Sequence, residues 1–453
     1  MGVAFCVLFA WWFISGVFML YWDYPGVDSA ERLRRSPILT PASIQFSPSG
    51  AFARLGISEL PKAVRLNSFD GRPVYRFDVA GKEWMVYADA GERPDLSSGL
   101  RTAAMWTGQP AEAATVQIVT EADQWTVPES FPPLRPLWKY SWPGGEAVYV
   151  SQVTGEVVQH TTRGSRIRAY LGPIPHWLYF TPLRKHLQLW RKIVIWSSGM
   201  ATLAALLGLI AGVWVYAPSR RIPYSGQKRW HMMLGLFFGV VACTWSFSGM
   251  LSMEPFPVQR KDDGAAALAG ALRGGSFKLA AFEDKHPRQA LAGLQSRELQ
   301  LTFFAGEPIY LATDGQRRST IIPVHGQPRE AVEQERLMEV IRAAGFPEQQ
   351  LISEYDAYYL DRDRQKPLPV ILVQRDGARY YIDPRTARIV GVYSSGMWVT
   401  RWLYHGLHSI EFPWLYNHRP AWDAVILLLL AGGTWLSVTA VILGFRLMRR
   451  KLG

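Results

Sequence analysis

Cysteine is nearly absent from this chain of 453 residues. The two that occur, Cys6 and Cys243, each lie inside a long apolar run. A disulfide framework for any domain outside those runs is therefore excluded. Such domains must be stabilised by ordinary hydrophobic cores.

The sequence also lacks the common signatures of soluble enzymes and of nucleic-acid binding. It has no phosphate-binding glycine loop, no nucleophile elbow and no zinc-protease helix motif. Charged residues make up only 19% of the chain, with 49 basic against 37 acidic side chains and a formal net charge of +12. No module of interleaved basic and aromatic residues accompanies this charge, so we expect no nucleic-acid partner. Attraction to the surface of a lipid bilayer is the better explanation of the net positive charge.

Hydrophobic residues, by contrast, form 49% of the chain, and 19 of them are tryptophan. An α-helix needs about 20 apolar residues to cross the hydrocarbon core of a bilayer. Runs of that kind lie at 1–22, 193–216, 231–253 and 424–445. We therefore expect four transmembrane helices. The first run has no small-residue cleavage site after it, which favours a retained helix over a cleaved signal peptide.

Two long segments, 23–189 and 254–420, separate these runs and are each large enough to fold as a domain. Basic residues crowd the short loop 217–230 and the tail 446–453. Because basic loops stay on the cytoplasmic side of a membrane, we expect this loop and tail to be cytoplasmic and both domains to face outward.

The chain contains an internal repeat. One set of matches joins the first and third apolar runs at a single offset (249 − 16 = 233): Trp12/Trp245, Ser15/Ser248 and Gly16/Gly249. A second set joins the later parts of the two halves (408 − 176 = 232): Tyr149/Tyr381, Thr154/Thr386, His176/His408, His186/His418 and Trp190/Trp422. The pattern predicts a membrane α-helical fold with α+β outer domains. Its four transmembrane helices would form two tandem repeats, each helix–domain–helix, around a pseudo-twofold axis along the membrane normal.

The second outer domain has the clearest local signals. An amphipathic pattern predicts a helix over 329–344, and alternating patterns predict strands over 370–374, 379–383 and 388–393. Asp376-Gly377 is typical of a tight hairpin turn.

Five histidines are candidates for a functional site. His176, His186, His408 and His418 are paired by the repeat and lie just before an apolar run, and His231 opens the third run at its opposite edge. Ionisable residues at a membrane edge are costly, so they are functional candidates by default. A histidine that only anchors a helix end is the alternative, and repetition at identical spacing argues against it for the two pairs.

Metal ligation is the obvious use of paired imidazoles, and a closed zinc site is one possibility. His176 and His186 cannot share an ion, however, because ten residues along a helix advance about 15 Å. Haem fits better, since two histidines can hold its iron from opposite faces of a flat macrocycle between apolar helices. We therefore expect haem b, one or two groups, with iron held by His176, His186, His408 and His418. His176 with His408 and His186 with His418, or the crosswise pairing, both remain open.

His231 has no counterpart within the chain, because the repeat would place one just before residue 1. Either the natural start lies further upstream and carries a histidine, in which case His231 could bind a second haem between the starts of the first and third runs, or this copy has lost a ligand and His231 only anchors its helix. Asp123 and Asp356 each precede an aromatic residue by two positions. They are weaker candidates for substrate binding, against the simpler interpretation as solvated loop carboxylates.

With these residues in hand, the chain resembles the PepSY-associated transmembrane family of iron-regulated membrane proteins. The likeness runs over nearly the whole length and rests on four motifs: Arg229-Trp230-His231 with Ser248-Gly249, Thr154-Gly155-Glu156, His176-Trp177-Leu178-Tyr179-Phe180, and the segment from His405 to His418. The resemblance implies a bacterial inner-membrane protein with periplasmic PepSY-type domains. Some relatives are haem-containing reductases of ferric siderophores. The basic residues and histidine that the family carries before its first span are missing here.

The leading hypothesis is a haem-binding inner-membrane reductase that transfers electrons to a periplasmic ferric siderophore and so releases its iron. Its partners would be the ferric siderophore, the lipid bilayer and an unidentified electron donor. One alternative is a membrane-anchored binding module that holds or regulates a periplasmic peptide, peptidase or envelope protein. A siderophore permease ranks third, because no broken-helix pair and no intramembrane carboxylate is apparent.

Overall fold

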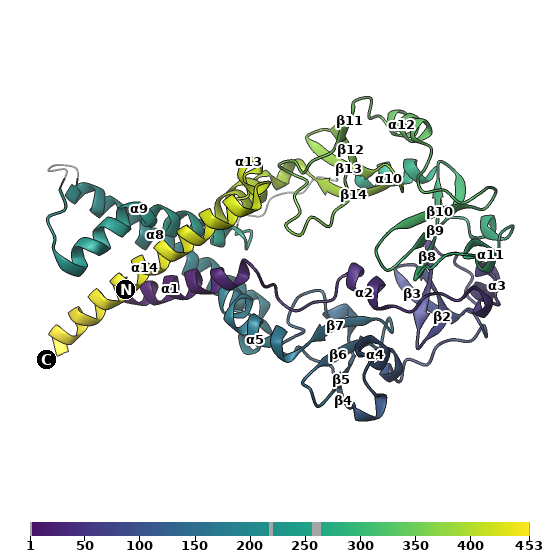
Figure 1. The fold of residues 1–453 in the computed structure, drawn as a ribbon, viewed down its shortest axis with the longest axis horizontal. Coiled ribbons are helices and arrows are strands. Elements are labelled where there is room, and N and C mark those ends of the chain that lie inside the picture. The colour runs from purple at the N-terminus through teal and green to yellow at the C-terminus, as the bar shows by residue number, and fades with distance from the viewer. Residues whose placement is uncertain (1, 217–220, 256–263, 453) are drawn as a thin grey trace.

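The computed structural model describes residues 2–216, 221–255 and 264–452. Figure 1 shows a bundle of helices at one end and an arc of three β-sheets at the other. Both chain ends lie at the end of the bundle away from the sheets. Part of the basic loop expected at 217–230, including Arg220, lies outside the described residues.

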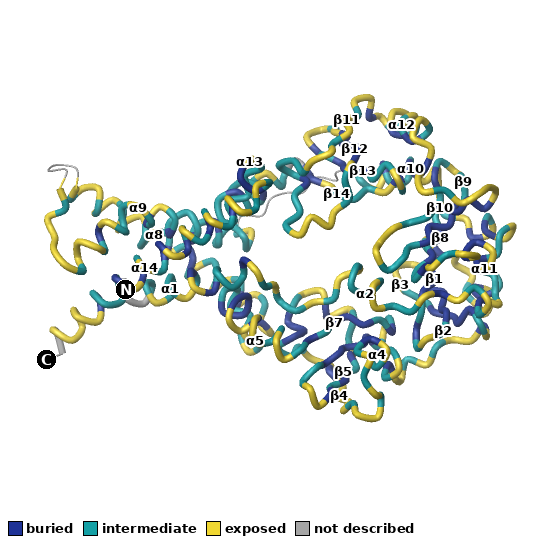
Figure 2. The backbone as a smooth tube through the Cα atoms, in the orientation of Figure 1, coloured by how far each residue is buried: buried dark blue, intermediate teal, exposed yellow. Residues whose placement is uncertain are grey.

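Three helices are long and apolar enough to cross a membrane: α8 (Leu187–Tyr216), α9 (Gly226–Leu251) and α14 (Arg419–Leu452). Most of their side chains are not buried within the protein (Figure 2). On α8 and α9, Trp196, Trp214 and Phe237 are 70%, 78% and 74% exposed. Large apolar side chains exposed in this number suit contact with lipid rather than water.

The predicted layout of four transmembrane helices in two tandem units is wrong. Among the described residues, only the three helices above meet the length and hydropathy that a span requires. The first helix, α1 (Gly2–Met19), has 18 residues and ends before the expected boundary at Trp22. Within it, Phe5–Met19 forms an apolar helix shorter than these three. The chain then continues without regular secondary structure from Trp22 to Asp28.

The helices nevertheless pack as one bundle. Helix α8 lies along α9, α9 along α14, and α14 along α1. Two glycines of α14 make the close approaches possible, since a Cβ on Gly432 would lie 2.1 Å from the Phe238 ring and one on Gly433 would lie 2.4 Å from the Phe13 ring. Aromatic side chains of α9 and α1 thus fill the space that these glycines leave.

All three sheets are antiparallel, and two of them have four strands. One has the order β4-β5-β6-β7, with β4 (Thr115–Val119), β5 (Leu137–Ser141), β6 (Ala147–Ser151) and β7 (Val157–Thr161). The other has the order β11-β12-β13-β14, with β11 (Gln349–Ile352), β12 (Val370–Arg375), β13 (Ala378–Asp383) and β14 (Arg388–Tyr393). Each of these sheets lies between the bundle and the third sheet (Figure 1).

The third sheet has six strands and joins the two halves of the chain. Its order is β10-β9-β8-β1-β2-β3, with β1 (Ala63–Phe69), β2 (Arg72–Val79), β3 (Lys82–Tyr87), β8 (Glu298–Phe304), β9 (Glu307–Thr313) and β10 (Ser319–Pro323). Val64 pairs with Leu301 and Leu66 with Leu299 at the junction, and all four side chains are buried in one core. The segments expected to be separate domains therefore share a sheet and a core.

The shorter helices cover the sheets and connect them to the bundle. They are α2 (Ser29–Arg35), α3 (Pro48–Ala53), α4 (Leu100–Thr107), α5 (Arg163–Leu171), α6 (Pro173–Trp177), α7 (Thr181–Arg184), α10 (Ala265–Arg273), α11 (Pro287–Ala290), α12 (Gln334–Ala343), α13 (Pro413–Tyr416) and the π-helical η6 (Val399–Gly406). The strands expected in the second half are confirmed as β12, β13 and β14, with the hairpin turn at Asp376 and Gly377. The amphipathic helix begins only at Gln334, because Arg329 is held in a backbone bridge to Ile321.

Candidate functional site

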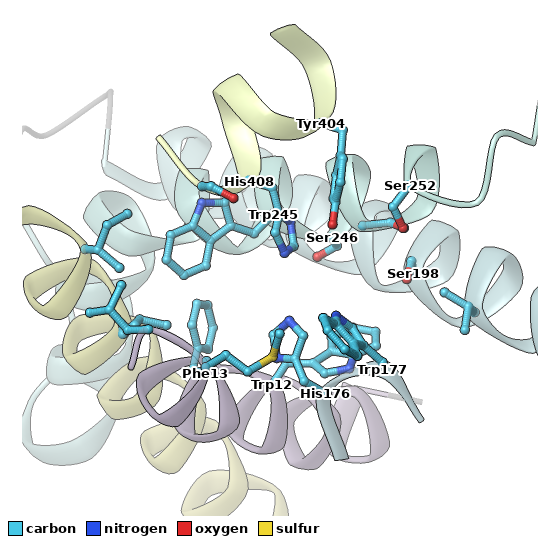
Figure 3. Close-up of a pocket in the computed structure, with 18 of the residues that line it drawn as sticks. Trp12, Phe13, His176, Trp177, Ser198, Trp245, Ser246, Ser252, Tyr404 and His408 are labelled. Carbon is cyan, nitrogen blue, oxygen red and sulfur yellow. The ribbon is translucent and has the colours of Figure 1, made fainter. Parts of the chain in front are cut away.

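A cavity of about 400 Å³ lies where the bundle meets the sheets. Its volume falls in the range of ligand and cofactor pockets, and its walls are mainly aromatic and aliphatic. His176 and His408 lie on opposite sides of it, with Trp12 and Phe13 on the side of His176 and Trp245 and Tyr404 on the side of His408 (Figure 3).

The two histidines are presented by equivalent segments. His176 lies near the end of α6 and His408 just after η6, and in each half a turn and a short helix, α7 or α13, then lead into a long helix, α8 or α14. The residue two positions after each histidine, Leu178 or Ile410, has a positive φ of 54° or 52°, which is unusual for a branched side chain. Strain of this kind persists only where the surrounding structure holds it, and it concentrates at functional sites.

Two tryptophans hold these turns against the long helices. The indole N–H of Trp190 donates to the carbonyl of Trp177, at 2.9 Å, and the indole of Trp422 donates to the carbonyl of Ser409, at 3.0 Å. Each carbonyl belongs to the residue directly after a histidine. The position of each imidazole is thus fixed by a buried side chain of the following helix.

Serine hydroxyls orient the imidazole rings. Ser15 Oγ lies 3.1 Å from His176 Nδ1, and Ser248 Oγ lies 3.0 Å from His408 Nδ1. Each hydroxyl has one proton, which it donates within its own helix, Ser15 to the carbonyl of Trp11 and Ser248 to that of Trp245. The serine oxygen therefore accepts from Nδ1–H, and this assigns the tautomer in which Nε2 carries the lone pair.

Both imidazoles are neutral. Burial lowers the pKa of His176 and of His408 well below the ordinary value of a histidine, and their mutual proximity lowers that of His176 further. Neutral imidazole with its other nitrogen hydrogen-bonded is the form that ligates metals. The two rings are therefore prepared as ligands.

The spacing of the rings fits one iron between them. Their centroids are 6.1 Å apart and their planes make an angle of 76°. An ion that takes one nitrogen from each ring needs about 2 Å per bond, and the ring centres lie about 1 Å further out, which gives roughly 6 Å. Each ring can rotate about its metal–nitrogen bond, so crossed planes are compatible with a shared ion. The apolar cavity around them suits a porphyrin, so the residues present fit haem.

A small residue next to each imidazole keeps the cavity open. Gly16 and Gly249 both line it, and a Cβ on either would lie 3.8 Å from the nearest ring carbon of His176 or His408. A Cβ on Gly16 would also come within 2.9 Å of Leu430. The Ser-Gly dipeptide of each half thus supplies both an orienting hydroxyl and space.

The other predicted histidines lie elsewhere. His186 and His418 are exposed at the starts of α8 and α14, and His418 Nδ1 is 2.8 Å from the carbonyl of Trp414. His231 is on α9, where its Nδ1 lies 3.0 Å from Thr439 Oγ1 of α14, and it is not among the residues that line the cavity. The structure therefore brings together His176 and His408 and leaves these three apart.

The two candidate carboxylates support the sheets. Asp123 accepts from the buried Tyr149 hydroxyl at 2.7 Å, and Asp356 accepts from the buried Tyr381 hydroxyl at 2.9 Å. Asp123 also lies 3.3 Å from Lys139 Nζ. Each carboxylate thus anchors a strand residue, which explains its proximity to aromatic side chains.

Sequence reasoning missed the polar residues at the edge of the cavity, Arg362, Tyr404 and Glu411. Burial raises the pKa of the Glu411 carboxyl, against the opposing effect of Arg401 and Arg362. None of the three has a match of like chemistry in the first half: Gly172 stands at the position of Tyr404 and Tyr179 at that of Glu411. The repeat, which found the histidines, therefore gave no signal for them.

No family model, no curated protein and no solved structure matches this chain.

Proposed function

We propose that this chain is a haem-binding reductase of a bacterial inner membrane, a member of the PepSY-associated transmembrane family, which transfers electrons to a ferric siderophore in the periplasm. The observation that carries the proposal is the opposed pair His176 and His408, with centroids 6.1 Å apart inside an apolar cavity. When bound there, haem supplies a one-electron redox centre with two imidazole ligands.

The residues of the chain have separate roles in this proposal. His176 and His408 would hold the iron through Nε2, while Ser15 and Ser248 would keep the required tautomer. Trp245 packs against the His408 ring, with centroids 6.2 Å apart, and contributes to a lining that excludes water. Exclusion of water keeps the ligand set closed and lowers the local dielectric.

The outer domains would present the ferric chelate near the cavity. Iron(III) in the chelate accepts one electron and becomes iron(II), which hard oxygen ligands hold less strongly. The chelator then releases the metal without being broken. The sheets lie at one end of the bundle (Figure 1), and Arg362 of the loop between β11 and β12 lines the cavity, which is consistent with such a delivery.

Absorption spectra of the detergent-purified protein test the proposal. Protein from haem-replete cells should show a sharp α-band in the reduced-minus-oxidised spectrum, and the oxidised form should give the low-spin electron paramagnetic resonance signal of two axial imidazoles. The double variant His176→Ala/His408→Ala should lose both signals. A colourless wild-type protein would contradict the proposal and favour the membrane-anchored binding module.

A further inference from the structure

The lining of the cavity contains very little charge. Among the described residues that line it, Arg362 is the only arginine or lysine and Glu411 the only acidic residue. The remaining polar groups are hydroxyls, imidazoles and indoles. A single guanidinium in such a setting is a strong candidate for binding an anionic part of whatever occupies the cavity.

Arg362 reaches the cavity from a distant part of the chain. It belongs to the loop between β11 and β12, where Asp361 accepts from the backbone N–H groups of Gln365 and Lys366, both at 2.5 Å, and so keeps the loop compact. Its own side chain crosses to the end of α1. There it donates to the carbonyls of Met19, at 2.9 Å, and Leu20.

The position at the end of α1 favours a cation. The carbonyls of the last helical turn have no partner within the helix, and they carry the negative end of the helix dipole. Arg362 Nη1 also lies 3.3 Å from Asp23 Oδ1. These three contacts use three of the five N–H groups of the guanidinium, which leaves two for a further acceptor. The side chain is 32% exposed, so it lies at the mouth of the cavity.

Tyr404 is a second hydrogen-bond donor that lines the cavity. The Tyr404 hydroxyl points into the cavity in Figure 3, and Tyr404 also packs against the His408 ring with centroids 5.4 Å apart. The phenolic O–H is a hydrogen-bond donor. A guanidinium and a phenol at one cavity are suitable donors for a group with two carboxylates.

We propose that Arg362 binds a propionate carboxylate of the haem at the mouth of the cavity, with Tyr404 as a second donor. The inference rests on the proposed function and deepens it. It sets the direction in which the porphyrin lies, with its carboxylate edge towards the sheets and its apolar edge among Phe13, Trp245 and Leu430.

The test compares Arg362→Gln with a matched control, Arg364→Gln. Arg364 lies in the same loop and likewise donates to a backbone carbonyl, that of Asn417 at 2.9 Å, but does not line the cavity. Apo-protein purified from haem-deficient cells is titrated with haem and, separately, with haem dimethyl ester, which has no carboxylate. Thermal unfolding of each apo-variant in detergent shows whether the substitutions disturb the fold.

We expect Arg362→Gln to weaken haem binding roughly 10- to 100-fold, the value of a charge-assisted hydrogen bond, and Arg364→Gln to leave it unchanged. The wild type should bind the diester more weakly than haem by a similar factor, whereas Arg362→Gln should bind both alike. Arg362→Lys should recover part of the affinity. The reduction potential of Arg362→Gln should shift to more negative values, because a nearby positive charge favours the reduced form.

Three results would overturn the inference. Equal loss of haem affinity in Arg362→Gln and Arg364→Gln would assign the effect to loop structure. A diester penalty that persists in full in Arg362→Gln would place the carboxylates elsewhere. Unchanged haem binding in Arg362→Gln would reject Arg362 alone and leave the proposed function intact, while a wild type that binds no haem would reject both.

Discussion

The surroundings of His176 and His408 agree on one side of each ring and differ on the other. Both rings have a serine at Nδ1, a glycine beside the ring and a tryptophan that fixes the following turn. Around His408, however, polar residues stand where the first half has small or aromatic ones: Arg401 for Ala169, His405 for Pro173 and Glu411 for Tyr179. The two halves therefore have the same residues around the two imidazoles. They differ at the positions of Arg401, His405 and Glu411.

The polar cluster of the second half is also connected internally. Arg401 is 4% exposed and donates to the carbonyl of Glu411 at 2.6 Å and to that of Ala357. His405 Nδ1 lies 3.6 Å from Glu411 Oε2. The polar groups of the second half thus form one connected cluster that the first half lacks at the equivalent positions.

The largest expected effect is the loss of haem binding when either of the two equivalent histidines is replaced. His176→Ala and His408→Ala should each abolish stable haem binding, because both rings would hold one iron. His186→Ala and His418→Ala, which alter exposed histidines at helix starts, should bind haem like the wild type. The ratio of haem to protein after purification measures this. A variant at His186 or His418 that emerges colourless would show that the exposed pair takes part.

A smaller effect concerns the hydroxyls behind the rings. Ser15→Ala and Ser248→Ala each remove the acceptor that orients Nδ1–H, and loss of such a group typically costs 10- to 100-fold in metal affinity. We expect similar losses for both, since the two distances are 3.1 Å and 3.0 Å. Transfer of haem to an excess of apo-myoglobin gives the affinities. Unequal losses of haem affinity would show that the two serines do not contribute equally, although their distances to the imidazoles are nearly the same.

Two equivalent tyrosines, Tyr149 of β6 and Tyr381 of β13, stabilise the two four-stranded sheets. Tyr149→Phe and Tyr381→Phe each remove a buried hydrogen bond to a carboxylate, a loss of about 1.5–3 kcal/mol. Asp123 keeps Lys139 as a partner in the first variant, so we expect Tyr381→Phe to cost more. Thermal unfolding followed by circular dichroism in detergent measures both. The reverse order would show that Lys139 does not compensate for the lost hydroxyl.

The smallest effect is a pH dependence at Glu411. Burial raises its pKa in the folded protein above that of the unfolded chain, so the stability that it contributes is complete below about pH 4 and is lost as the pH rises through the folded pKa. Glu411→Gln should therefore become increasingly stabilising, relative to wild type, from pH 4 to pH 8. The difference in unfolding midpoint across that range is the measurement, with Tyr179→Phe as the control. A difference that does not change with pH would contradict the raised pKa.

Much of the local structure could be predicted. The runs at 193–216, 231–253 and 424–445 correspond to α8, α9 and α14, because long apolar stretches have few alternatives to a helix. The second-half strands were found because alternation and the turn at Asp376-Gly377 are properties of neighbouring residues. The start of α12 was missed because Arg329 pairs with a distant strand.

The candidate site was predictable only in part. The repeat singled out four histidines, and the spacing argument excluded a site shared by His176 and His186. It could not choose between His176 with His408 and the crosswise pairing, since that choice depends on how two turns pack more than 200 residues apart. Arg362 and Glu411 carried no signal, because the repeat places no residue of like chemistry at the equivalent positions of the first half.

The sequence by itself determined that three long apolar helices form, that the chain has no disulfide and that histidine, serine and glycine recur at matched positions. The tertiary structure decided that α1 ends at Met19, that β1 pairs with β8 to join the halves in one sheet, and that His176 meets His408 across a cavity. The reason is physical. Helix and turn formation depend on residues a few positions apart, whereas strand pairing, burial and the meeting of side chains depend on which surfaces pack together once the whole chain has folded.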